Sequence, residues 1–167
     1  PFPGWQKMVA FLSSASILSY GIGPICLLAL RKIQPEQRRP FKLLGSLFFC
    51  NIAFYVCNLM LYWCGFSVIW KLCLAILFGF IIYLCYQKRN FWSGNYSLYW
   101  FFSYITVLLL LSYLGPFGGI ARLKFPFGML IIFPFSLLML YLSQYCLVRD
   151  QAEKESFDLM NKQLQDL

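Results

Sequence analysis

Three residues, Gly21, Gly23 and Pro24, interrupt the first apolar segment of the chain and are the strongest candidates for chemistry within it. Proline has no backbone N–H to donate, and its ring displaces the carbonyl four residues earlier, here that of Tyr20. A carbonyl freed inside a membrane span is costly unless it faces protein, water or a bound cation. Spans interrupted by glycine and proline are typical of transport sites. The cluster therefore predicts a helix break or hinge at such a site, with a plain kink satisfied by neighbouring helices as the alternative.

The ionisable groups that an enzyme needs are missing from the apolar segments. The chain has no histidine, and its six acids lie in a loop or in the C-terminal tail: Glu36, Asp150, Glu153, Glu155, Asp158 and Asp166. Its seven cysteines form no CxxC pair and fall within apolar runs, where small residues allow helices to approach closely. An intramembrane enzyme requires an acid, a base or a metal ligand. The sequence therefore predicts no catalytic residue, no metal site, no cofactor and no enzyme activity, and any ionisable part of a transport site is expected on other helices.

The elements that must position the glycine–proline cluster are membrane helices. Hydrophobic residues make up 60% of the 167 residues and charged residues only 12%, whereas about a quarter of the residues of a soluble domain are charged. Apolar segments of helix length alternate with short polar loops, which predicts an all-α, polytopic membrane bundle of about five transmembrane helices. The expected spans are residues 8–30, 44–64, 68–86, 98–114 and 127–147. Residues 115–119 are expected to form a loop or a short re-entrant turn.

Lysine and arginine are concentrated in the loops on one side of these spans. The first of these loops carries Arg31, Lys32, Arg38, Arg39 and Lys42. With the first helix running inward, ten of the 14 basic residues lie on the inner side, which predicts a cytoplasmic C-terminus. The basic residues sit in loops between apolar runs, so the net charge of +8 does not indicate nucleic-acid binding. Residues 148–167 are expected to form a cytoplasmic tail, with apolar residues at the spacing of an amphipathic helix: Phe157, Met160, Leu164 and Leu167.

The first segment and its loop resemble the tenth helix and following loop of bacterial amino-acid permeases of the amino acid–polyamine–organocation superfamily. That family commonly shows LSYGxGP, then LR, then P, then RPFR or RPFK. The matching elements here are Leu18-Ser19-Tyr20-Gly21-Ile22-Gly23-Pro24, Leu30-Arg31, Pro35 and Arg39-Pro40-Phe41-Lys42. The hairpin of residues 44–86 is similar to helices eleven and twelve in hydropathy and spacing, and residues 96–147 would be two extra helices.

The resemblance implies a secondary transporter of two inverted five-helix repeats, with its amino-acid substrate bound at unwound stretches of helices one and six. Those helices are not part of this sequence, so this chain would be a C-terminal fragment that is not transport-competent alone. Helix ten borders the extracellular side of the substrate path, which would place Ser16, Ser19 and Tyr20 on that path. Ordinary helix packing is the alternative role for these three residues.

Two functional hypotheses follow from these observations. In the first, the chain is the C-terminal part of an amino-acid permease of a bacterial inner membrane, and its partners are the lipid bilayer and the missing N-terminal helices. In the second, it is a free-standing membrane scaffold or interaction subunit with a cytoplasmic helical tail. The chain begins with Pro1, and no cleavable signal pattern precedes the first apolar run, which fits a chain that begins part-way through a longer protein. The substrate and coupling ion are not predicted, and a homo-oligomer is left open.

Overall fold

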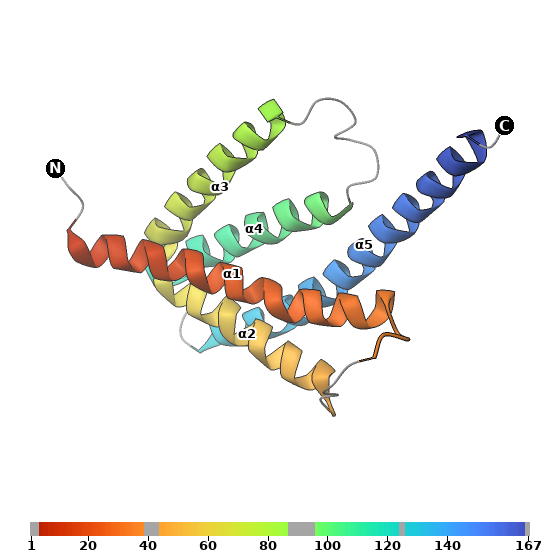
Figure 1. Ribbon diagram of the computed structural model, residues 1–167. Coiled ribbons are helices and arrows are strands. Elements are labelled where there is room, and N and C mark those ends of the chain that lie inside the picture. The colour runs from red at the N-terminus through yellow and green to blue at the C-terminus, as the bar shows by residue number, and fades with distance from the viewer. Residues whose placement is uncertain (1–3, 39–43, 87–95, 124–125, 166–167) are drawn as a thin grey trace.

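The part of the chain that the structure describes folds as a bundle of five long α-helices (Figure 1). The computed structural model describes residues 4–38, 44–86, 96–123 and 126–165, with side chains up to Ser156. Every regular element in these ranges is helical. The helices are α1 (Trp5–Ile33), α2 (Ser46–Cys64), α3 (Phe66–Tyr86), α4 (Tyr96–Leu114) and α5 (Phe127–Gln165).

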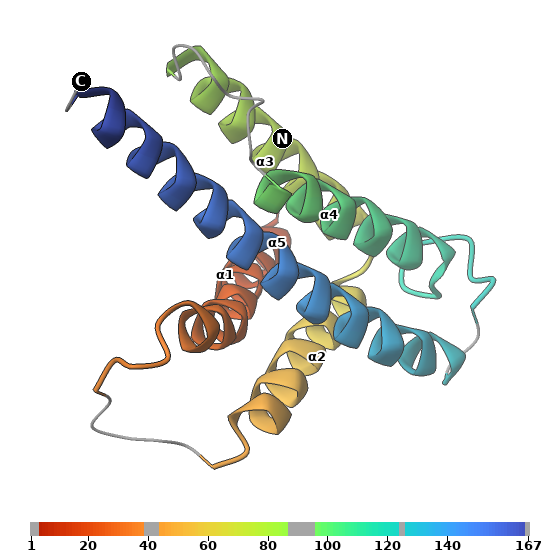
Figure 2. The same cartoon turned by 90° about the vertical axis from the view of Figure 1, so that its right-hand side faces the viewer.

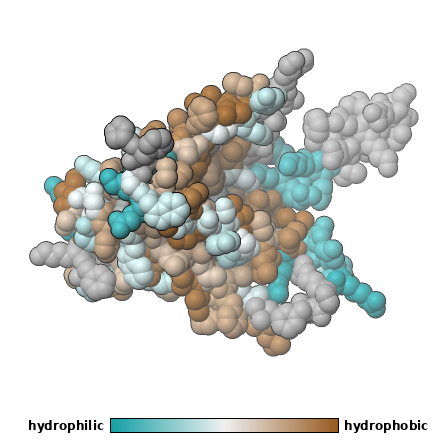
Figure 3. Space-filling view, turned by 60° about the vertical axis from the view of Figure 1, so that its left-hand side comes forward, coloured by the Kyte–Doolittle hydropathy of each residue, from teal (hydrophilic) through white to brown (hydrophobic). Residues whose placement is uncertain are grey.

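All five helices are long and apolar enough to cross a membrane. An α-helix rises about 1.5 Å per residue, so about 20 residues suffice for a hydrocarbon core of about 30 Å. Large apolar side chains are exposed along every helix, and Figure 3 shows hydrophobic surface across the middle of one face, with hydrophilic residues toward its ends. The fold is therefore a polytopic membrane bundle, as the sequence predicted.

The helices are not packed equally. Helix α1 lies mainly against α2, whereas α5 contacts α1, α2 and α4 and so occupies the centre of the bundle (Figures 1 and 2). Helix α3 packs on the outside, chiefly against α1 and α4. The core forms where α1, α2, α4 and α5 meet, around Ile25, Phe54, Leu61, Leu108 and Leu140.

A single glycine, Gly65, connects α2 to α3. Its φ of 87° lies in the left-handed region that favours glycine. An added Cβ would lie 2.8 Å from the carbonyl oxygen of Phe117, and that same carbonyl accepts a hydrogen bond from the backbone N–H of Phe66 at 2.9 Å. The glycine-rich segment after α4 is thus a non-helical loop that packs on the α2–α3 turn, and both lie at the same end of the bundle.

Helix α5 continues well beyond the apolar part of its sequence. It passes through Pro134 and runs to Gln165 without a break in the helical assignment. The tail that the sequence placed after residue 147 therefore continues α5. The side chains of residues 157–165 and Leu167 lie outside the described part, so the amphipathic pattern of the tail stays a prediction.

Asp150, near the start of this extension, is bonded to the first turn of α4. Its carboxylate accepts hydrogen bonds from the backbone N–H groups of Tyr96 at 2.8 Å and Ser97 at 2.9 Å, and from the Ser97 hydroxyl. The first N–H groups of a helix have no partner within the helix, and its N-terminus carries a partial positive charge. Asp150 of α5 therefore caps α4 and fixes the two helices to each other at this end.

Candidate functional site

The two sides of α1 have different environments. Ile25, Leu28 and Ala29 are buried on the side that faces the bundle. Ser16, Ser19, Tyr20 and Gly23 are exposed, and their spacing of three, one and three residues places them on one side of the helix. We call these four residues the hydroxyl face of α1. The structure thus brings together the three hydroxyl-bearing residues selected from the sequence.

The hydroxyl groups on this face retain capacity for a ligand. Ser16 Oγ donates to the carbonyl of Leu12 at 3.1 Å, and Ser19 Oγ donates to that of Ala15 at 3.2 Å. Each serine has satisfied its donor on the backbone of α1, and its oxygen can still accept a hydrogen bond. Tyr20 is 72% exposed, and its phenol can both donate and accept. The face therefore suits a polar ligand with an ammonium group or other donors.

Gly21 lies on the opposite side and allows α1 to pack closely on α2. It is buried, and a Cβ built on it would meet Cys57 Cβ and Phe54 Cε2 at 3.8 Å each. An alanine would make ordinary contact there, but a side chain larger than alanine would force the two helices apart, because Phe54 is itself almost fully buried. The three residues of the predicted break therefore have different surroundings: Gly21 faces α2, Gly23 is open, and Pro24 is half-buried.

Helix α1 keeps its helical assignment through Gly21, Gly23 and Pro24. Pro24 nevertheless has no N–H to donate to the carbonyl of Tyr20, so the regular helical hydrogen bond is missing at that carbonyl. The hinge remains a prediction from sequence.

The basic residues after this site hold the end of α1 in place. Arg31 donates from Nη1 to Ser46 Oγ at the start of α2. Lys32 Nζ lies 5.9 Å from the ring centroid of Tyr141 on α5, which is within cation–π range. Both cations also lie in the last turn of α1, where they stabilise the helix dipole. Arg38 is exposed in the following loop, and Arg39 and Lys42 lie outside the described residues.

A buried polar network joins α2, α4 and α5, and the sequence reasoning did not identify it. Asn58 is fully buried. Its Nδ2 donates to the Phe54 carbonyl at 3.0 Å and to Ser136 Oγ at 3.1 Å, and its Oδ1 accepts from the Tyr104 hydroxyl at 2.6 Å. Its described donors and acceptors are paired with protein groups, so the network holds helices together and offers nothing to a ligand. The available sequence signal was an asparagine within the apolar span 44–64, which also contains Asn51.

Comparison with known proteins connects this chain with amino-acid transporters. It is 32% identical over 157 residues to the aspartate-proton symporter of Bacillus subtilis (strain 168), a match that covers 87% of this chain and 29% of the symporter. It is also 31% identical over 143 residues to the glutamate/serine transporter AimA of the same organism, covering 82% of this chain and 26% of that protein. No protein-family model matches the chain, and no solved structure matches it.

Both matches extend over most of this chain but only a part of each transporter. The chain thus spans less than a third of the length of these curated relatives. Together with the five membrane helices, the matches support the classification of the chain as an integral membrane protein similar to part of an amino-acid transporter. Neither relative is named as an enzyme.

Proposed function

We propose that this chain is the C-terminal part of a secondary active amino-acid transporter and that the hydroxyl face of α1 lines its substrate path. The observation that carries the proposal is the division of α1 into two faces. The side with Gly21 packs on α2, while Ser16, Ser19 and Tyr20 remain uncovered. Hydroxyl groups that line a path through a membrane protein replace the hydrogen bonds that a polar solute loses on leaving water.

The further details of the proposal rest on the sequence motif and the relatives. The LSYGxGP and RPFK elements favour the amino acid–polyamine–organocation superfamily, in which this chain would follow the first nine helices of a five-plus-five inverted repeat. Those earlier helices would cover the hydroxyl face and complete the site, so the chain would not transport alone. The excess of basic residues in the loops supports a cytoplasmic C-terminus, and the bacterial relatives support a location in the inner (plasma) membrane.

The proposed substrates are amino acids of the kinds named for the relatives, aspartate, glutamate and serine. The hydroxyl face carries no charged side chain. It would contact the polar parts of the substrate, while groups that bind its charges would come from the missing helices. Transport leaves the covalent structure of the substrate unchanged, so the proposed function requires no catalytic residue.

Uptake of radiolabelled aspartate, glutamate and serine by membrane vesicles that contain the intact native protein tests this function. Tyr20→Phe removes one hydroxyl and keeps the ring. We expect uptake efficiency to fall about tenfold or more, because a hydrogen bond to a charged group contributes about 1.5–3 kcal/mol. Ser16→Ala and Ser19→Ala should have smaller effects, because each hydroxyl already donates to its own helix.

Two matched controls remove the same groups elsewhere on the bundle surface. Tyr86→Phe removes the hydroxyl of an exposed tyrosine at the end of α3. Thr106→Val removes an exposed hydroxyl on α4 that donates to its own helix at 2.8 Å. Both controls should transport normally at equal membrane abundance. Uptake that Tyr20→Phe and Tyr86→Phe reduce equally, or not at all, would refute a substrate-facing role for α1.

The size of the native polypeptide separates this function from that of a free-standing interaction subunit. The match covers 87% of this chain but only 29% of the symporter, so the symporter is roughly three times as long as this chain. An antibody against the C-terminal sequence should therefore detect a band about three times the 19.6 kDa of this chain. A native band at 19.6 kDa would favour the scaffold or interaction subunit.

A further inference from the structure

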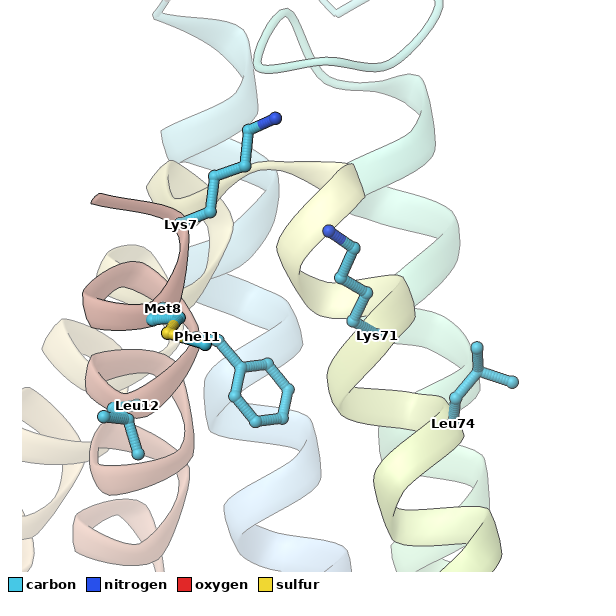
Figure 4. A pocket seen from close by; sticks show the side chains of 6 residues that line it. All are labelled: Lys7, Met8, Phe11, Leu12, Lys71 and Leu74. Atoms are coloured by element: carbon cyan, nitrogen blue, oxygen red, sulfur yellow. The ribbon is translucent and has the colours of Figure 1, made fainter. Parts of the chain in front are cut away.

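An apolar groove with two lysines at one end lies between α1 and α3. It has a volume of about 570 Å³ and is lined by Lys7, Met8, Phe11 and Leu12 of α1 and by Lys71 and Leu74 of α3. This volume is in the range of small-molecule sites, roughly 300–1,000 Å³. Figure 4 shows both lysine amines at the same end of the groove, beyond Met8, Phe11 and Leu12. None of the four residues of the hydroxyl face lines this groove.

The charged and apolar residues of the groove lie at the depths in the membrane where a lipid has its headgroup and its acyl chains. Lys7 and Lys71 fall within the first two turns of their helices, next to the exposed tryptophans Trp5 and Trp70. Tryptophan concentrates at the boundary between membrane and water. Leu12 follows Lys7 by five residues, about 7.5 Å deeper along the helix. The groove therefore has cations at the headgroup level and apolar walls at the level of the acyl chains.

The charges of the two lysines are not balanced within the described part of the chain. Neither amine forms a salt bridge with a described residue. The described acids lie at the other end of the bundle, with Glu36 after the end of α1 and Asp150, Glu153 and Glu155 on the extension of α5 (Figure 1). Two cations above an apolar groove call for a ligand with an anionic head and an apolar body.

We propose that this groove binds an anionic phospholipid. One acyl chain lies along Met8, Phe11, Leu12 and Leu74, and the phosphate lies between the amines of Lys7 and Lys71. The bound lipid fills the gap between α1 and the peripheral α3 and so connects the two helices. This site does not depend on the proposed transport function, because it requires only the groove, its charges and the membrane around it.

Native mass spectrometry of the intact protein, released from nanodiscs of phosphatidylcholine and phosphatidylglycerol, tests the site. We expect one phosphatidylglycerol to be retained preferentially. Each lysine near a membrane surface contributes about fivefold to the affinity for an anionic lipid, so Lys7→Gln/Lys71→Gln should lower the preference about 30-fold. Lys7→Arg/Lys71→Arg should preserve it. The control Arg122→Gln/Lys154→Gln removes two exposed cations outside the groove and should also preserve it.

Leu12→Trp tests the apolar wall while keeping both lysines. Leu12 is 64% exposed, so the larger ring can fill the groove without disturbing the core, and retention should fall as in the double glutamine variant. If either Lys7→Gln/Lys71→Gln or Leu12→Trp retained phosphatidylglycerol as well as the unaltered protein does, the proposal would be overturned. Loss of the lipid on addition of free phosphate or aspartate would also overturn it, because the lysines would then bind a soluble anion.

Discussion

The buried hydroxyl of Tyr104 provides a sharp test of how the bundle is held together. Tyr104→Phe removes this hydroxyl and keeps the ring, which stacks on Trp100 and Phe135 at centroid distances of 5.5 and 6.0 Å. The lost bond joins α4 to Asn58 on α2 at 2.6 Å. It is the described partner of Asn58 Oδ1, so the substitution also leaves a buried carbonyl oxygen unpaired.

The expected cost is about 1–2 kcal/mol of unfolding free energy. Hydrogen bonds between membrane helices contribute about 0.6 kcal/mol on average and at most about 1.7, and an unpaired buried acceptor adds to this loss. Ser136→Ala should cost less, about 0.6 kcal/mol. Asn58 Nδ2 would then lose one acceptor and keep the Phe54 carbonyl at 3.0 Å. Tyr104→Phe should therefore lower the unfolding free energy more than Ser136→Ala does.

Ser112 on the same helix provides a matched control. Its hydroxyl is buried and has no hydrogen-bond partner among the described residues. Ser112→Ala should therefore leave the stability unchanged or raise it, although it also removes a buried hydroxyl from α4. The assay is reversible unfolding of the purified protein in mixed micelles with increasing dodecyl sulfate, followed by helical circular dichroism. Equal costs for Tyr104→Phe and Ser112→Ala would refute the argument that pairing, and not burial alone, determines the contribution.

Two further predictions concern close packing and the cap on α4. A Cβ at Gly128 would lie 2.4 Å from the Tyr62 hydroxyl oxygen, so Gly128→Ala should destabilise the protein by about 1–3 kcal/mol in the same unfolding assay. Gly23→Ala, where nothing lies within 4 Å, should be tolerated, and an equal loss in both variants would contradict the packing argument. Asp150→Asn should weaken the first turn of α4 by about 0.5–1 kcal/mol through loss of its negative charge. Hydrogen exchange at the Tyr96 and Ser97 amides should accelerate, and unchanged exchange would exclude Asp150 as a cap.

The sequence predicted the fold class and the number of membrane helices because both depend on the mean hydropathy of segments of helix length. Five apolar segments separated by polar loops require five helices in a membrane, since only helices and closed barrels satisfy every backbone group there. The contacts between helices depend on single residues far apart in the chain. Asn58 is 46 residues from Tyr104 and 78 from Ser136, and one asparagine hardly changes the mean hydropathy of a span. Its pairing was therefore invisible in the sequence pattern.

The acidic residues show that the burial of a polar side chain also cannot be predicted from its position in the sequence. All six were interpreted as residues of a polar loop or a charged tail, which is where they lie in the sequence. Asp150 is nevertheless only 8% exposed, because the first turn of α4, 54 residues away in the chain, lies against it. The hydroxyl residues of α1 could be selected from motif and helical spacing. Their exposure could not be predicted from the sequence, because it depends on which side of α1 packs against α2.

Side-chain hydrogen bonds connect α2, α4 and α5 to one another, whereas the serines in the first half of α1 bond only within their own helix. Helices α2, α4 and α5 are joined by the paired side chains around Asn58, by Asp150 and by the indole of Trp100, which donates to the Met139 carbonyl at 2.8 Å. The bonded serines in the first half of α1, Ser14, Ser16 and Ser19, donate only to their own helix. That part of α1 is thus held to its neighbours by apolar packing, and its described serines form no bond to another helix. We therefore expect the first half of α1, with the serines of the hydroxyl face, to move more readily than its end, which Arg31 and Lys32 hold to α2 and α5.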